Sequence, residues 1–220
     1  MYFHREGRKI IAITLVSVLA IFAAMVLTVH SWTWVHFLFI IILIGLAFWI
    51  IRFFRIPRRI FTESTSQLIA PADGTIVTIE ETYEKEYIKD DCIQISIFMS
   101  ANDVHVNRYP CDGVVEYVKY SRGNYFVASY PKSSDLNERS SVGIRLENGN
   151  KILVRQVAGA MARRIVCYAK EGQTVKQNQE LGFIRFGSRV DVFVPKSFTI
   201  DVDIENRVKN AITPICSFGK

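Results

Sequence analysis

The stretch LGFIRFGSRVDVFVP (residues 181–195) has the alternating pattern of a β-strand, interrupted by a glycine and a serine. Val190, Val192 and Val194 recur at every second position, as side chains on one face of a strand do. Glycine weakens a strand interior, so Gly187 in front of Ser188 needs a reason. Two interpretations are open: a local bulge or bend, or a peptide bond at which the chain is cut.

The same period of two continues through most of residues 61–220. Asp-Gly, Asn-Gly and Glu-Gly pairs separate the alternating segments, and such pairs favour turns. No long amphipathic helix interrupts the pattern. The sequence therefore predicts a mainly β domain over 61–220, an antiparallel β-sandwich or barrel.

Residues 1–60 have a different composition, because residues 10–29 and 33–51 contain no charged residue. A helix of about 20 residues spans the roughly 30 Å hydrocarbon core of a bilayer. The two segments therefore predict a transmembrane helical hairpin inside a membrane anchor of residues 1–60. A cleaved signal peptide fits less well, because the first apolar run is long and the second follows at once.

The basic residues indicate how the hairpin is oriented. Residues 1–60 carry seven basic side chains and one acidic side chain, all outside the two apolar runs. Basic flanks stay in the cytoplasm and attract anionic lipid, so we expect a protein of the cell (inner) membrane with its β domain on the cytoplasmic face. The whole chain has a net charge of +6, which leaves residues 61–220 neutral. The high pI is therefore no sign of a nucleic-acid partner.

Candidate chemistry in residues 61–220 rests on few side chains. His105 is the one histidine there, which excludes a zinc site built from several histidines, and we expect no metal. Asp73 lies in PADG (residues 71–74), where Asp-Gly alone favours a hairpin turn. A lone histidine is often structural, and the Gly187–Ser188 pair alone is compatible with a bulge.

Taken together and in order, four motifs resemble the phosphatidylserine decarboxylase family, and in particular its short bacterial members with a membrane hairpin. They are APADG (70–74), NDVHVNRYP (102–110), NER (137–139) and FGSRVDVFVP (186–195). The resemblance covers essentially all of residues 60–220. It implies a β-rich fold related to the hybrid-motif fold of sugar-permease IIA domains.

The resemblance also implies an activity. It is the pyruvoyl-dependent decarboxylation of phosphatidylserine to phosphatidylethanolamine and CO2, after self-cleavage between Gly187 and Ser188. Ser188 would become the pyruvoyl group that forms a Schiff base with the lipid amine, and no external cofactor would be needed. His105 and Asp73 would be the other catalytic residues. We expect phosphatidylserine in the bilayer as partner, and two chains from one precursor that stay associated, with homo-oligomerisation left open.

One position departs from the family pattern. Longer members carry a second histidine three residues after the first, in the relay for self-cleavage, and this chain has Arg108 there. Arginine stays protonated and is a poor base. Either His105 serves both steps or Asp73 acts with another partner. Arg108 and, on weaker grounds, Arg139 are candidates for binding the lipid headgroup.

Two other classes of protein remain as alternatives. One is a membrane-anchored β-sandwich that binds a ligand and is never cleaved. The other is a serine hydrolase that uses Ser188 and His105 on an external ester or peptide. Intact mass separates both from a self-cleaving decarboxylase.

Overall fold

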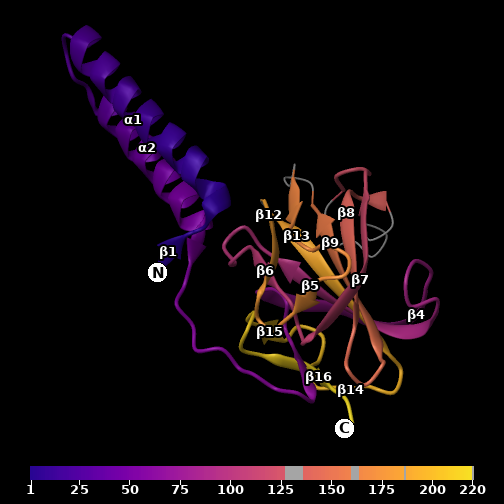
Figure 1. Cartoon of the computed structure of the whole chain (residues 1–220). Coiled ribbons are helices and arrows are strands. Elements are labelled where there is room, and N and C mark those ends of the chain that lie inside the picture. Colours follow the sequence, from indigo (N-terminus) through magenta and orange to yellow (C-terminus); the bar gives the residue numbers. More distant parts are fainter. Residues whose placement is uncertain (127–135, 160–163, 186, 220) are drawn as a thin grey trace. The chain divides into compact units, whose positions relative to one another are not determined.

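The structure is a computed structural model that describes residues 1–126, 136–159, 164–185 and 187–219. It divides into two compact units, Met1–Arg58 and Arg59–Lys220 (Figure 1). Phe186, the first residue of the FGSRVDVFVP motif, lies outside the described residues. The two units are described separately below.

The first unit is a helical hairpin formed by α1 (Arg8–Thr28) and α2 (Trp34–Phe53). Thr33 caps α2, since its side chain and backbone both pair with His36. At the open end of the hairpin, β1 (Tyr2–Phe3) pairs antiparallel with β2 (Arg55–Ile56). Both helices are long and apolar enough to cross a membrane, judged by length and composition. This agrees with the two apolar helices predicted from the sequence.

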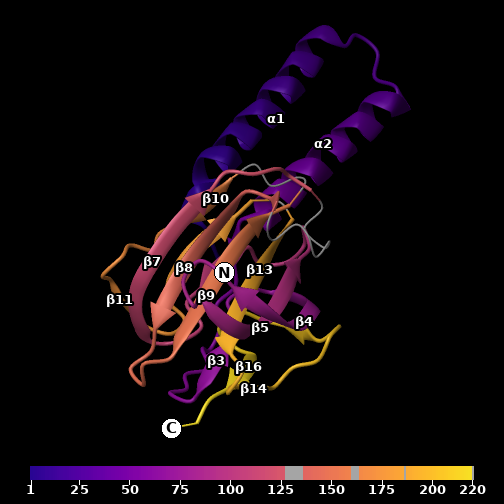
Figure 2. The same ribbon diagram turned by 90° about the vertical axis from the view of Figure 1, so that its right-hand side faces the viewer.

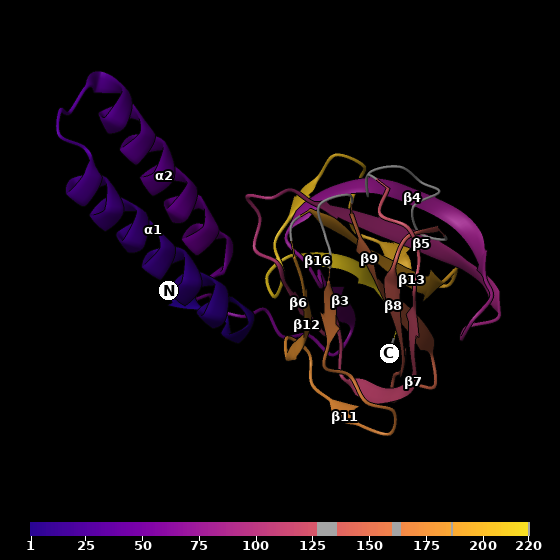
Figure 3. The ribbon, with the colours of Figure 1, turned by 90° about the horizontal axis from the view of Figure 1, so that it is seen from above.

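The second unit is built on one large antiparallel sheet. In the described residues, eight strands follow one another in the order β11-β7-β8-β9-β13-β5-β4-β15, and the sheet curls without closing into a barrel (Figures 2 and 3). Their bounds are β11 (Thr174–Val175), β7 (Gly113–Ser121), β8 (Arg139–Arg145), β9 (Lys151–Ala158), β13 (Ser188–Pro195), β5 (Asp90–Met99), β4 (Gly74–Glu84) and β15 (Arg207–Val208).

Two three-stranded sheets complete the β domain. One has the order β10 (Ile165–Cys167), β12 (Glu180–Ile184), β6 (Val106–Arg108), and the other β14 (Thr199–Ile200), β16 (Pro214–Ser217), β3 (Gln67–Ile69). Both contribute to the core that covers one face of the large sheet, with Leu181 and Ile184 from β12 and Leu68 from β3. The alternation of the large strands buries their apolar side chains against these small sheets.

Strand β13 runs through the middle of the large sheet, between β5 and β9. Val190, Val192 and Val194 point into the main core, as the alternation predicted. The opposite face of β13 is also buried: Arg189 and Asp191 are fully buried and form an ion pair, with 2.8 Å between Nε and Oδ1. Phe193, farther along that face, belongs to a second, smaller apolar cluster.

The end of the β4–β5 hairpin covers this second face. Tyr87 packs over β8 at Gly143, where a Cβ atom would lie 2.5 Å from the tyrosine ring. Arg155 of β9 lies on the same face and pairs with Glu84 and Glu86, at 3.4 Å and 3.5 Å. The large sheet is therefore buried on both faces along its middle strands.

The prediction of a mainly β domain with an antiparallel sheet, preceded by two apolar helices, is confirmed. The open, curled sheet with smaller sheets against it is closer to a sandwich than to a barrel. The relation to the hybrid-motif fold stays a prediction.

Candidate active site

Ser188 is the first residue of β13, at one end of the large sheet. It pairs in register with Met99, the last residue of β5, and with Ala158, the last residue of β9. Its side chain is fully buried, and its hydroxyl donates to the Met99 sulfur at 3.3 Å. The hydroxyl of the candidate nucleophile is thus held in the core by a weak acceptor.

Gly187 has a φ of +68°, a left-handed conformation that side-chain-bearing residues rarely adopt. The chain therefore turns sharply just before it enters β13. A glycine at this position allows a backbone geometry that brings the preceding carbonyl close to the serine hydroxyl. Gly187 lies just before β13, and Ser188 is its first residue. The glycine therefore does not interrupt the hydrogen-bond ladder of the strand.

His105 lies directly before β6 and is fully buried. Its Nδ1 is 2.9 Å from the carbonyl oxygen of Asp103, which can only accept, so Nδ1 carries a proton. In the neutral ring Nε2 is then the basic nitrogen. The carbonyl of His105 accepts from the amide of Ile184 at 3.4 Å, and the ring lies 6.4 Å from that of Phe183. Strand β12 thereby brings His105 close to the segment that leads to Ser188.

The loop before His105 is fixed by Asp103. Its carboxylate accepts from the Ser100 amide and hydroxyl, both at 2.8 Å, and from Arg207 at 2.6 Å. Burial alone would raise the pKa of Asp103, but the hydrogen bonds from Arg207 and Ser100 outweigh it and lower the pKa below its usual value. Asp103 therefore closes the loop that begins at Ser100 and also holds it to Arg207.

Asp73 directly precedes β4, the strand next to β5. Its two carboxylate oxygens accept from Arg59 Nη1 and Nη2, both at 2.6 Å. The amide of Asn210 adds a third hydrogen bond at 2.8 Å. Asp73 lies at the same end of the sheet as Ser188, because β4 begins where β5 ends. Its main partner is Arg59, which the sequence had indicated only as one of the basic residues flanking the membrane hairpin.

The two candidate headgroup ligands lie in different places. Arg108 donates to the carbonyl of Asn178 at 2.6 Å, and its guanidinium lies 4.8 Å from the ring centre of Phe61. Arg139 pairs in register with Val157, which pairs with Arg189, so its side chain is on the opposite face of the sheet from Ser188. There it forms an ion pair with Glu86 at 3.5 Å.

Two buried amides near Ser188 were also missed. Asn107 and Gln156 are fully buried, and Gln156 donates to Asn107 at 2.7 Å. Asn107 donates in turn to the sulfur of Met99 at 3.6 Å. The alternation HVNR places Asn107 two residues after His105, which is a signal for one shared face, but nothing local to β9 indicates the partner Gln156.

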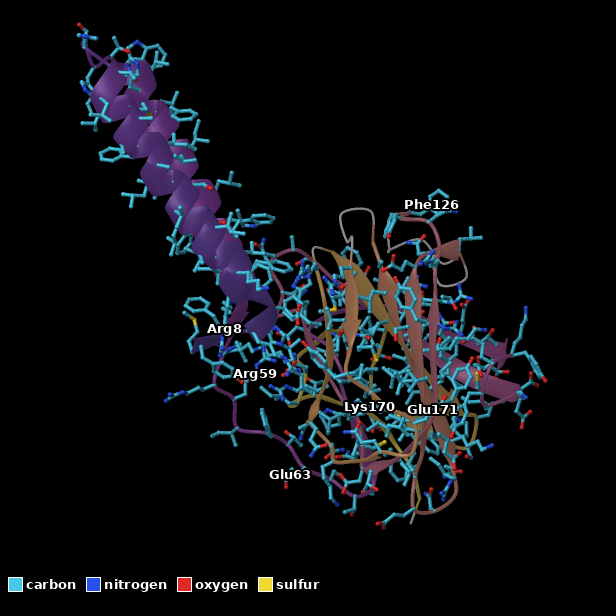
Figure 4. All side chains as sticks on the ribbon, turned by 45° about the horizontal axis from the view of Figure 1, so that its top comes forward. Arg8, Arg59, Glu63, Phe126, Lys170 and Glu171 are labelled. Atoms are coloured by element: carbon cyan, nitrogen blue, oxygen red, sulfur yellow. The ribbon has the colours of Figure 1, made fainter. Side chains whose placement is uncertain are left out.

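A cavity of about 490 Å³ opens at the other end of the β domain. It is lined by Glu63, Cys111, Asp112, Lys176 and Phe218, among others, and by none of the candidate residues. Figure 4 shows Glu63 and Phe126 at opposite ends of the β domain. Phe126 belongs to the Ser188 end, because Asn137 bridges it to Ala158, the register partner of Ser188.

The organisation of the chain, with a glycine leading into a buried serine at the head of a central strand in a mainly β domain, can be compared with known proteins. Residues 46–215 match the family profile described as phosphatidylserine decarboxylase. The chain therefore belongs to the phosphatidylserine decarboxylase family.

Curated relatives agree with this family over most of the chain. A phosphatidylserine decarboxylase proenzyme of Amoebophilus asiaticus is 48% identical over 164 residues, which are 74% of this chain and 73% of the relative. That of Parabacteroides distasonis is 48% identical over 172 residues, 78% of each chain. That of Bacteroides thetaiotaomicron is 42% identical over 202 residues, 91% of this chain and 88% of the relative. The last alignment extends well into the helical hairpin.

Proposed function

We propose that this chain is a proenzyme that cleaves itself between Gly187 and Ser188 and then decarboxylates phosphatidylserine to phosphatidylethanolamine and CO2. Membership of the family and the proenzyme names of its relatives support the reaction. The placement of Gly187 and Ser188 supports the site of cleavage, because a left-handed glycine leads directly into a buried serine at the head of a strand.

Cleavage begins when Ser188 Oγ adds to the carbonyl carbon of Gly187 and loses its proton to a base. The C–N bond then breaks, the nitrogen takes up a proton, and an ester replaces the amide. Elimination of the ester releases Gly187 as a carboxylate and leaves dehydroalanine at 188. Tautomerisation and addition of water release ammonia and leave a pyruvoyl group, so no oxidant or external cofactor is consumed. In the decarboxylation this group supplies an electron sink for the electrons left behind by CO2.

His105 is the proposed base and acid of the site. Its buried ring, with the proton on Nδ1, leaves Nε2 as the nitrogen that can take a proton from Ser188. Asp73 contributes a negative charge at the same end of the sheet, held in place by Arg59. Arg108 is the proposed contact for the lipid phosphate, since a planar guanidinium suits a phosphate group.

Residue 188 would stay in position after the cut. Strand β13 keeps its pairing with β5 and β9 on both sides, because that pairing does not involve the Gly187–Ser188 bond. The chain 188–220 also supplies β15, which pairs with β4, and β16, which pairs with β3. We therefore expect the chains 1–187 and 188–220 to remain associated without a covalent link.

The hairpin suits a substrate that stays in a bilayer. A diacyl lipid leaves the membrane slowly, so the reaction has to occur at the headgroup plane, and α1 and α2 can anchor the β domain there. The basic flanks favour the cell (inner) membrane with the β domain on its cytoplasmic face.

Intact mass spectrometry under denaturing conditions tests the proposal. The wild-type protein should give two species, 1–187 and 188–220, and the smaller should carry a pyruvoyl group in place of its amino terminus. Ser188→Ala should stay at full length and be inactive on labelled phosphatidylserine in vesicles. A single full-length species that still decarboxylates the lipid would overturn the mechanism. A full-length species without decarboxylase activity would instead favour an unprocessed binding module, and ester hydrolysis by it would favour a serine hydrolase.

A further inference from the structure

Two buried amides lie in the core against the face of the large sheet that carries Ser188. Asn107 of β6 and Gln156 of β9 are fully buried, among Ile97, Met99, Val154 and Val190. Burying an amide costs free energy unless all its polar atoms are paired. Among the described residues no donor pairs with Gln156 Oε1, which makes the amide costly for the fold. A reason other than stability is therefore needed for this pair.

The hydrogen bonds of the pair run toward Ser188. Gln156 Nε2 donates to Asn107 Oδ1 at 2.7 Å, which fixes the orientation of the Asn107 amide. Asn107 Nδ2 then faces the Met99 sulfur at 3.6 Å. The hydroxyl of Ser188 is on the same sulfur, at 3.3 Å. One atom of Met99 thus separates the amide donor from the serine side chain.

The backbone of β12 makes room for this arrangement. Gly182 pairs in register with Asn107. A Cβ atom at Gly182 would lie 2.8 Å from Gln156 Nε2 and 2.2 Å from the carbonyl oxygen of Val166. A glycine at this position lets the Gln156 amide lie against the strand and reach Asn107.

A thioether is a weak acceptor, so the N–H of Asn107 is available to a stronger one. The stronger acceptor would appear during self-cleavage. When Ser188 Oγ adds to the Gly187 carbonyl carbon, the C=O π electrons move to the carbonyl oxygen, which becomes an oxyanion. The oxyanion needs a fixed donor in a dry site, and an amide held by a second amide is preorganised for this.

We propose that Asn107 Nδ2 donates to the oxyanion that forms at Gly187 during self-cleavage, and that Gln156 is the positioning residue that holds it. The proposal rests on the proposed cleavage at Gly187–Ser188. No further reactant is required, because the oxyanion collapses when the C–N bond breaks and the nitrogen of Ser188 is protonated. Gln156 acts only through Asn107.

The test follows self-cleavage of the full chain during cell-free synthesis into lipid nanodiscs, by intact mass over time. Asn107→Asp keeps the shape of the side chain but removes the donor, and it should slow cleavage by about 100-fold, as loss of one oxyanion donor does. Asn107→Leu should behave alike. Gln156→Leu should slow cleavage by about 10-fold, and the double variant Asn107→Leu, Gln156→Leu should be no slower than Asn107→Leu.

A matched control is available in the same sheet. Gln94 of β5 is also a buried glutamine, but it donates to Ser96 on the opposite face. Gln94→Leu should cleave at the wild-type rate. Thermal unfolding of the double variant Asn107→Leu, Gln156→Leu adds a second readout. A purely structural amide pair predicts a lower melting temperature, whereas a pair kept for cleavage predicts an unchanged or higher one, because replacing both partners by apolar groups leaves no unpaired amide atom.

The outcomes separate this inference from the proposed function. Wild-type cleavage at 187–188 with equally fast cleavage in Asn107→Asp and Asn107→Leu would overturn the role of Asn107 alone. Equal slowing in Gln94→Leu would overturn it too, since the effect would then belong to the core in general. A wild-type chain that is never cut at 187–188 would overturn the proposed function, and this inference with it.

Discussion

Arg59 and Asp73 form a two-point ion pair, with both guanidinium nitrogens 2.6 Å from a carboxylate oxygen. The side chains are only 12% and 9% exposed, so the pair is shielded from water at the same end of the sheet as Ser188. Arg59 also donates to the backbone carbonyl and side chain of Asn210. A carboxylate held at this many points keeps its position, which is what an orienting group near a base requires.

Asp73→Asn removes this charge and keeps the shape of the side chain. If Asp73 orients the group that activates Ser188, self-cleavage should slow by about 10-fold or more, which intact mass measures over time. Asp112→Asn is the control, because it breaks the exposed pair with Lys176 at the opposite end of the domain and should leave cleavage unchanged. Equal rates in all three proteins would remove Asp73 from the reaction.

His105→Ala removes the one histidine of residues 61–220. We expect decarboxylation to fall by at least about 100-fold, as loss of a general acid or base does. Accumulation of the full-length precursor would show that His105 is also needed for self-cleavage. Normal cleavage without decarboxylation would show that another group acts in self-cleavage. Full cleavage together with full turnover would exclude His105 from the site.

Arg108→Lys keeps the positive charge but loses the planar fork. A phosphate contact predicts an apparent KM for phosphatidylserine about 10-fold higher, with self-cleavage intact. Arg145→Lys, which affects an arginine paired with Glu116 at the far end of β8, is the matched substitution and should change neither quantity. Loss of cleavage in Arg108→Lys would instead assign Arg108 to the fold, through its bond to Asn178.

The Asp103–Arg207 contact makes the stability of the β domain sensitive to acid. The pKa of Asp103 is lowered in the folded state, so its contribution is present above the unfolded pKa of about 3.9 and is lost as pH falls through the folded value. Arg207 is well exposed, so Arg207→Gln should cost about 1 kcal/mol at pH 7. Thermal unfolding followed by circular dichroism should show this difference vanish in acid. A difference that persists below the folded pKa would contradict the assignment.

The orientation of the hairpin is open to a direct test. Because the basic residues lie on its outer ends, both termini should be cytoplasmic. A reporter enzyme active only outside the inner membrane, fused after residue 220, should give no signal, and one placed between the two helices should give a strong one. Strong activity at residue 220 would contradict the proposed topology.

Much of the architecture could be predicted because apolar residues recur at every second position along the strands. Val190, Val192 and Val194 alternate, and they point into the main core. The burial of the opposite face could not be read in this way, since Arg189 and Asp191 look like solvent-facing residues until they are seen paired with each other. Their cover, Tyr87 over Gly143, joins segments that are distant in sequence.

The residues of the candidate site also fall into those that could be predicted and those that could not. Ser188, His105 and Asp73 stand in recognisable motifs, but Met99, which binds Ser188, and Arg59, which binds Asp73, do not. Arg59 lies in a segment whose charge had suggested a membrane flank, and it binds Asp73 instead. Gln156 reaches Asn107 only because β9 and β6 contact the same core. Such long-range side-chain pairs leave no pattern along the chain, so sequence reasoning finds the first residue and misses the second.

The position of β13 between β5 and β9 has a consequence for biogenesis. Residues 188–220, which would become the small chain, supply a strand in the middle of the sheet. This strand therefore has to be in place before the sheet is complete, and it cannot be added afterwards at an edge. The proposed scission geometry around Ser188 exists only once both neighbouring strands are in place. If the chain is processed as proposed, cleavage would depend on complete folding: a molecule with an incomplete sheet would keep an ordinary serine and stay inactive, and the reactive ketone would form only in fully folded molecules.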